Sequence, residues 1–233
     1  MARLPRLVVP GQLHLLVQRG HNRQPVFDTD ADYRAYIDAM RECALTHKVG
    51  LHAYALVPNA VHLLVTPADA DGMSRMMQAL GRRYAGWYNR SHGRSGALWD
   101  GRFRAGLIEA SSHLLQATVL VESQPQRAGA VPDAALWGWS SLPHHLGRRN
   151  DAAVADHPLF WSLGNTPFDR EMAYRRLFEQ GLSAAEARQL EETADKGWAL
   201  GSAAFLSMLA GQLERPIQPR PRGRPRKIDS VPD

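Results

Sequence analysis

Six arginines gather between positions 82 and 104, where Asp100 is the single acidic residue that opposes them. The six are Arg82, Arg83, Arg90, Arg94, Arg102 and Arg104. The rings of Trp87, Tyr88 and Trp99 are interleaved with them. Arginines follow phosphates, and aromatic rings stack on unpaired bases at about 1–3 kcal/mol each. We therefore predict that the six arginines and Tyr88 contact single-stranded DNA. In the alternative interpretation, Trp87 and Trp99 anchor the core and the arginines form a solvated face.

A second basic motif, PRGRPRK, lies at positions 221–227. It is similar to an AT-hook, because proline and glycine keep the backbone extended enough to lie along a narrow minor groove. Arg222, Arg224 and Arg226 would enter that groove, where the negative potential of A·T-rich DNA is deepest. The alternative is a merely basic, disordered tail.

Composition narrows the classes of function. Residues 1–149 of the 233 carry 17 Lys and Arg against 11 Asp and Glu, residues 150–214 carry 5 against 10, and residues 215–227 carry 6 against none. Basic regions attract polyanions by releasing condensed counterions. The single cysteine, Cys43, excludes a disulfide framework and a cysteine-rich zinc site. Neither a signal peptide nor an apolar run of roughly 18 to 20 residues is present, so we expect a cytoplasmic protein.

Alternating strand and helix patterns must position these residues. Strand patterns occur at 13–18, 51–57, 61–66 and 103–109, and helical patterns at 28–47, 73–88 and 111–122. The turn Pro58-Asn59 predicts a hairpin between the second and third strands. The order β-α-β-β-α-β is typical of the ferredoxin-like split βαβ. We predict an α+β fold: an antiparallel sheet with helices on one face, then a small helical C-terminal module and a disordered basic tail.

The predicted domains follow from this order. Residues 1–131 form the ferredoxin-like domain, and 132–156 form a junction dominated by loops. Helical patterns at 168–181, 183–193 and 202–213 predict a helical module over 157–213, with a helix-turn-helix-like arrangement as one option. Residues 214–233 form the basic tail.

Five segments together resemble the REP-associated branch of the IS200-like (Y1, HUH) transposases. They are MARLPRLVVPGQLHLLVQRGHNRQ (1–24), HAYALVPNAVHLL (52–64), GRRYAGWYNRSHGRSGALWDGRF (81–103), QRAG (126–129) and WSS (139–141). The resemblance implies a domain that binds hairpin-bearing single-stranded DNA. In such enzymes, two histidines on a strand hold Mg²⁺ or Mn²⁺, the ion polarises the scissile phosphate, and a helical tyrosine attacks it.

The sequence departs from the family pattern at both of these roles. Where the family has Asn-His-hydrophobic-His, this chain reads Asn59-Ala60-Val61-His62. Aligned through Arg127-Ala128-Gly129, Leu120 occupies the position of the tyrosine. Leucine has no nucleophile, and one imidazole is a poor site for a hard cation. The resemblance therefore implies that Ala60, His62 and Leu120 are degenerate catalytic positions and that no cofactor is expected.

Two remnants of enzyme chemistry stay open. Tyr88 or Tyr84 could act as a displaced nucleophile, and Mg²⁺ or Mn²⁺ would then be needed. Their alternative roles are core packing for Tyr84, and base stacking or simple exposure for Tyr88. His62 is a weak candidate metal ligand, with Glu122 as a speculative partner. The alternative for His62 is a strand histidine with a purely structural role.

Three functions are consistent with these patterns. The first is a DNA-binding, transposase-like protein that cannot cleave. The second is an active transposase with a displaced tyrosine. The third is a regulator that binds double-stranded DNA through the helical module and the tail. The expected partner is DNA, as a single-stranded hairpin or an A·T-rich duplex, without a membrane. The protein would be associated with the nucleoid as a monomer or homodimer.

Overall fold

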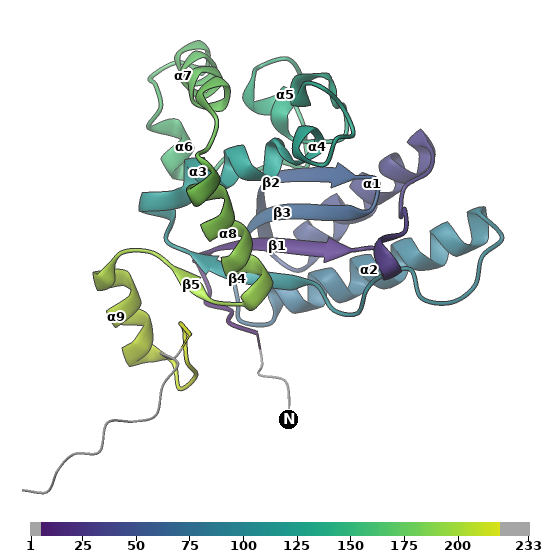
Figure 1. Ribbon diagram of the computed structural model, residues 1–233, viewed down its shortest axis with the longest axis horizontal. Helices are drawn as coiled ribbons and strands as arrows, with labels where there is room; N and C mark the ends of the chain where they lie inside the picture. The colour runs from purple at the N-terminus through teal and green to yellow at the C-terminus, as the bar shows by residue number, and fades with distance from the viewer. Residues whose placement is uncertain (1–5, 220–233) are drawn as a thin grey trace, which may run out of the picture.

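Five strands form one sheet in the order β2-β3-β1-β4-β5 (Figure 1). The computed structural model describes residues 6–219, so the predicted tail contacts Arg222, Arg224 and Arg226 lie outside the described residues. The strands are β1 (Leu13–Arg19), β2 (Val49–Val57), β3 (Ala60–Pro67), β4 (Arg104–Ile108) and β5 (Ala199–Leu200). The first four pair antiparallel, and β5 joins β4 in parallel. The α+β fold with a mostly antiparallel sheet is confirmed.

The predicted hairpin is present. Val57 of β2 pairs with Ala60 of β3 across the Pro58-Asn59 turn. In the middle of the sheet, Leu15 of β1 pairs with Leu64 of β3 on one side and with Gly106 of β4 on the other. The near-continuous apolar sequence of β1 is typical of a strand that is buried on both faces of a sheet.

Two helices cover one face of the sheet. They are α1 (Asp30–Thr46) and α2 (Gly72–Ser91). Thr29 and Asp32 form a capping box that begins α1, which lies within the helical pattern predicted at 28–47. The core on this face joins apolar residues of both helices, such as Tyr36 and Leu80, to strand residues such as Leu63.

The opposite face is covered as well, by α3 (Ala110–Glu122) and α8 (Ala184–Lys196). The expectation of helices on one face therefore holds only for the two crossover helices. Leu13 and Leu15 are apolar on this second face, so a further layer is needed to remove them from water. A Cβ atom at Gly106 would lie 2.6 Å from the backbone of Thr193, so α8 packs directly on the backbone of β4.

The helices predicted near the C-terminus are present as α7 (Pro167–Gln180), α8 and α9 (Ala203–Gln212). Shorter helical segments are η1 (His21–Arg23), α4 (Gln124–Arg127), η2 (Ala134–Leu136), α5 (Leu142–His145) and α6 (Pro158–Trp161). The three longer helices bury their apolar residues in different clusters: Tyr174 of α7 packs with Phe160, and Phe205 of α9 packs with Leu7. The predicted division into domains stays an expectation. Among the described helices, none has the length and apolarity to cross a membrane.

Candidate functional site

His62 and Leu120 line the same cavity, of about 240 Å³. Strand alternation directs Ala60 and His62 to the face under α3, whereas Val61 and Leu63 belong to the core under α1 and α2. Leu120 reaches this cavity from the last turns of α3. The structure therefore brings together the strand histidine and the helix position that the sequence alignment paired.

The carboxylates near His62 already form ion pairs with arginines. Glu191 and Asp195 line the same cavity, but each carboxylate pairs with an arginine at 2.8 Å, Arg127 and Arg19 respectively. Burial, followed by the nearby Arg19 charge, lowers the pKa of His62 to about 3, so its imidazole is neutral. A Mg²⁺ ion prefers about six oxygen ligands in octahedral geometry. The side chains that remain around His62 do not fit such an ion.

Ala60 lies directly opposite Arg19 in the β1–β3 pairing and is buried. Its methyl group offers no lone pair to a cation. Since Ala60 and His62 share a strand face, a histidine at position 60 would project toward the same side of the sheet as His62. The side chains at positions 60 and 62 therefore share one side of the sheet, and only the one at position 62 can offer a lone pair.

Glu122 does not join His62. Its carboxylate is buried and accepts hydrogen bonds from Ser141 Oγ, from His145 Nδ1 at 2.6 Å and from Tyr174 OH at 2.5 Å. The speculative pairing of Glu122 with His62 in a metal site is therefore corrected. The physical reason is that Glu122 belongs to a buried polar network with the segment that follows α3.

Tyr84 and Tyr88 lie on α2, on the opposite face of the sheet from His62. Tyr84 is 1% exposed and donates to the backbone oxygen of Val26 at 2.5 Å. Tyr88 is 2% exposed and donates to the carboxylate of Asp28. Burial is the main cause that raises the pKa of Tyr88 to about 12. The prediction that Tyr88 stacks on DNA bases is not supported, because its ring is already packed inside the protein.

Two groups of side chains in the described part of the chain are close enough to hold a metal ion. They are His144, His145 and Asp156, and Asp28, Asp32 and His92. In the second group, Asp32 Oδ2 accepts three hydrogen bonds from Asp28 and Thr29, and Asp32 Oδ1 contacts His92 Nε2 at 2.8 Å. These contacts cap α1, which is a sufficient structural role for Asp32.

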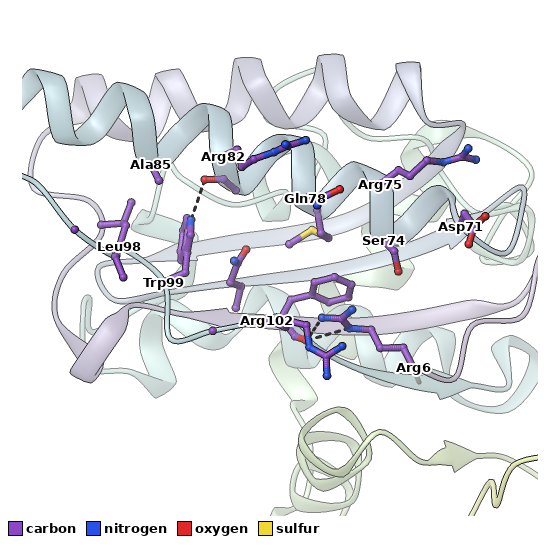
Figure 2. Close-up of a pocket in the computed structure, with 17 residues that line it drawn as sticks. Arg6, Asp71, Ser74, Arg75, Gln78, Arg82, Ala85, Leu98, Trp99 and Arg102 are labelled. Atoms are coloured by element: carbon purple, nitrogen blue, oxygen red, sulfur yellow. Dashed lines mark hydrogen bonds between the residues drawn. The ribbon is translucent and has the colours of Figure 1, made fainter. Parts of the chain in front are cut away.

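A larger cavity, of about 640 Å³, lies between α2, the 96–103 loop and the N-terminal segment. Figure 2 shows Arg75 and Arg82 along α2, with Arg6 and Arg102 on the other side of the cavity. Within residues 6–219, Asp71 is the single acidic residue that lines it. A cationic rim of this kind attracts a polyanionic strand.

The interior of this cavity is apolar. The buried residues Met77, Leu98 and Phe103 contribute to its lining. Arg6 lies over the Phe103 ring at 3.7 Å and donates to the Phe103 carbonyl oxygen at 3.1 Å, so the cationic rim and the apolar wall are joined. Trp99 donates its indole N–H to the Gly81 carbonyl at 3.2 Å, which holds the loop against α2 (Figure 2).

Two of the six predicted DNA-binding arginines, Arg82 and Arg102, line the large cavity. Arg104 lies in a neighbouring cavity of about 280 Å³, which Arg102 and Lys196 also line. Arg104 donates to the backbone oxygen of Asp195 at 3.0 Å. The three arginines therefore lie along one continuous part of the surface.

The other three predicted arginines have different surroundings. Arg83 pairs with Glu42 of α1. The guanidinium of Arg94 lies 5.5 Å from the centroid of the Tyr88 ring. Arg90 is exposed near the end of α2. The structure does not bring these three into the large cavity.

Three residues of the large cavity were missed by sequence reasoning: Arg6, Arg75 and Gln18. Arg75 lies two helical turns before Arg82, so the helical period could have indicated that both share a face. Gln18 is a buried polar residue that directly follows the apolar run Leu15-Leu16-Val17 of β1, and this position in the sequence could have indicated it. It is 7% exposed, and its Oε1 atom is buried without a hydrogen-bond partner.

Comparison with known proteins adds a family match. Residues 10–123 match the family described as IS200-like transposase. The solved REP-associated tyrosine transposase bound to a REP hairpin is similar to this chain with a TM-score of 0.52 and 17% identity, over 67% of this chain and 93% of that one. A candidate transposase of Deinococcus radiodurans R1 is 24% identical over 50% of this chain and 93% of its own, with a TM-score of 0.34. No curated protein sequence matches the chain. At these identities, the likeness to the REP-associated structure concerns the fold.

Proposed function

We propose that this chain, whose residues 10–123 match the IS200-like transposase family, is a member of that family that binds hairpin-bearing single-stranded DNA without cleaving it. The observation that carries the proposal is the cavity lined by both His62 and Leu120. Strand breakage of the family type needs a hydroxyl nucleophile beside two metal-holding histidines. Here the helix position offers a hydrocarbon, and Ala60 stands at the other histidine position.

The DNA-binding half of the proposal is supported by the large cavity. Arg6, Arg75, Arg82 and Arg102 surround an apolar interior, which suits a strand with anionic phosphates and unpaired bases. The REP-associated transposase of similar fold was solved with a REP hairpin, which motivates hairpin DNA as the first ligand to test. Loss of cleavage leaves such a surface intact, because the arginines lie away from the His62 cavity.

A covalent-trapping assay tests the catalytic half. The full chain is mixed with Mn²⁺ and a hairpin oligonucleotide, and protein–DNA adducts are resolved under denaturing conditions. We expect no adduct from the natural chain and an adduct from the Ala60→His/Leu120→Tyr double variant, because that variant restores both chemical roles. The Ala60→His/Leu120→Phe variant is the matched control, since it has the same ring without the hydroxyl. An adduct formed by the natural chain would refute the proposal.

One observation favours the second candidate, an active enzyme with a displaced tyrosine. The Tyr88 hydroxyl donates to Asp28, which belongs to one of the two groups able to hold a metal ion. The burial of Tyr88 and the capping role of Asp32 argue against it. In the trapping assay, this candidate requires an adduct from the natural chain that disappears in Tyr88→Phe and persists in Leu120→Ala.

The third candidate function, a regulator that binds double-stranded DNA, is distinguished from the proposed function by comparing affinities for different DNA ligands. Affinities for hairpin, unstructured single-stranded and A·T-rich duplex DNA are measured for the full chain and for a chain that ends at residue 214. The proposed function predicts that hairpin affinity remains after truncation. A preference for the duplex that is lost on truncation would favour the third function. Sedimentation of the complex reports whether a monomer or a homodimer binds, and imaging reports whether the protein lies on the nucleoid.

A further inference from the structure

We infer that one unpaired nucleotide of the bound strand docks across two adjoining cavities, its base in the cavity lined by Gln18 and its phosphate beside Arg102, Arg104 and Lys196. The inference rests on the proposed DNA binding and deepens it. Lys196 belongs to α8, which lies outside the family-matching residues 10–123.

The larger cavity has the surface that a base requires. Buried apolar side chains, including Met77, Leu98 and Phe103, form much of its lining. A base that is paired within a duplex is stacked and cannot enter a side pocket without being extruded, whereas an unpaired base is free to do so. The cavity therefore selects an unpaired nucleotide.

Gln18 supplies the polar atom that a buried base would need. It lines the cavity, is 7% exposed, and its Oε1 atom accepts no hydrogen bond. A buried acceptor without a partner is costly, and a ligand that donates to it removes the cost. The Gln18 amide nitrogen lies on the side of Gly81, which lines the cavity, and rotation of the amide about its last side-chain bond would exchange Nε2 with Oε1. Since a glutamine amide pairs with the N6 and N7 edge of adenine, we expect adenine to be preferred.

The neighbouring cavity, of about 280 Å³, suits a phosphate. In the part of the chain that the structure describes, its charged lining consists of Arg6, Arg102, Arg104, Lys196 and Arg215, with Asp195 as the single acid. The Asp195 carboxylate is shared between Arg19 at 2.8 Å and Arg104 at 4.0 Å, and Lys196 pairs with Glu192 at 2.5 Å, so these carboxylates balance only part of the cationic lining. Like charges held together repel one another, and an anion between them relieves the repulsion.

The two cavities are adjacent because Arg6, Arg102 and Phe103 line both. A nucleotide has the same two parts, a flat base and an anionic phosphate, joined by a sugar. Lys196 comes from the last turn of α8, and β5, which follows α8, pairs with β4 next to the shared wall. The C-terminal segment therefore completes the phosphate cavity.

An abasic scan on the natural, full chain tests the base cavity. The probe is a fluorescent hairpin oligonucleotide with a single-stranded extension, in which each extension nucleotide is replaced in turn by an abasic one. We expect one position at which the replacement weakens binding about tenfold, with adenine the preferred base there. If no position changes the affinity by more than about twofold, the docking site is refuted.

The Gln18→Leu variant assigns that position to Gln18. It should bind the intact oligonucleotide about tenfold more weakly and should respond little to the critical abasic replacement. Gln18→Met is the second variant, because it retains the side-chain length if leucine disturbs folding. Gln116→Leu on α3 is the matched control and should behave as the natural chain does. A positional response that survives in both Gln18 variants contradicts the inference.

Loss of a phosphate contact should change binding in a different way from loss of the base contact. Arg102→Ala and Lys196→Ala should weaken intact and abasic oligonucleotides by the same factor and reduce the salt dependence by about one counterion each. The exposed Arg176→Ala on α7 is the control and should change neither. Unchanged salt dependence in both test variants contradicts the phosphate cavity. If the natural chain binds no hairpin DNA at any salt concentration, the proposed function fails as well, whereas binding without positional response removes only the docking site.

Discussion

His145 Nδ1 donates a 2.6 Å hydrogen bond to Glu122, and their side chains are 2% and 0% exposed. The other oxygen of this carboxylate accepts from Tyr174 OH at 2.5 Å. Glu122 ends α3, His145 ends α5, and Tyr174 lies on α7. One buried carboxylate therefore ties the family-matching segment to two helices that follow it. A buried pair of this kind is costly to break, because the remaining charge is left without a partner.

Stability should fall as pH rises from about 6.5 to about 9. Burial alone would lower the pKa of His145, but the Glu122 carboxylate, together with Asp156, raises it to about 9. The folded state holds a proton that the unfolded state releases above its ordinary pKa of about 6.5. The stabilisation is therefore complete below that value and lost through this window, by about 3 kcal/mol for the shift alone. Urea unfolding at several pH values measures it.

A histidine variant provides the control for this pH effect. His113→Gln, on the partly exposed side of α3, should leave the pH slope unchanged. His145→Gln should be less stable below pH 6.5 and should lose most of the slope. A slope that persists in His145→Gln would assign the effect to another group.

Gly106→Ala should destabilise the protein by about 1–3 kcal/mol, the usual cost of inserting a methyl group into a packed site. The added Cβ would lie 2.6 Å from the backbone of Thr193, so α8 would have to move away from β4. Gly138→Ala is the matched control, because nothing lies within 4 Å of its Cβ position. Thermal unfolding distinguishes them. Equal melting temperatures for the two variants would mean that α8 does not pack as described.

Removal of divalent ions should leave hairpin binding and the melting temperature unchanged. The reason is that His62 has no partner ligand at position 60, and the carboxylates in its cavity are paired with arginines. Binding is compared in EDTA, Mg²⁺ and Mn²⁺ at constant ionic strength. A metal-dependent change that is absent from His62→Ala would show that the remnant site still holds an ion.

Arg75→Ala and Arg82→Ala should each weaken hairpin binding about three- to tenfold at low salt, with a smaller effect at high salt. Both guanidinium groups lie along α2 beside the large cavity (Figure 2). Arg34→Ala, on the exposed side of α1, is the control, and its ion pair with Asp30 is worth little. Anisotropy titrations at several salt concentrations measure the effect. Equal losses in all three variants would point to general charge attraction.

Much of the fold could be predicted from local patterns. Three local patterns span only a few residues each and can therefore be recognised in the sequence. They are the apolar residues of β1, the Pro58-Asn59 turn and the acidic residues in the first turn of α1. The second helical layer was not predicted. Apolar residues of α8 pack against strands that lie much earlier in the sequence. This contact joins distant segments, so the pattern within a short segment does not predict it.

The sequence by itself determined what the site lacks, because a methyl at position 60 and a leucine at position 120 cannot ligate or attack in any fold. Only the tertiary structure decided what the remaining groups do. In the folded chain, Tyr88 is buried, and Glu122 accepts a hydrogen bond from His145. Arg6, Arg102 and Lys196 line two adjoining cavities. The physical reason is that chemical identity is carried by single residues, whereas burial, pairing and charge clustering arise when distant segments pack together.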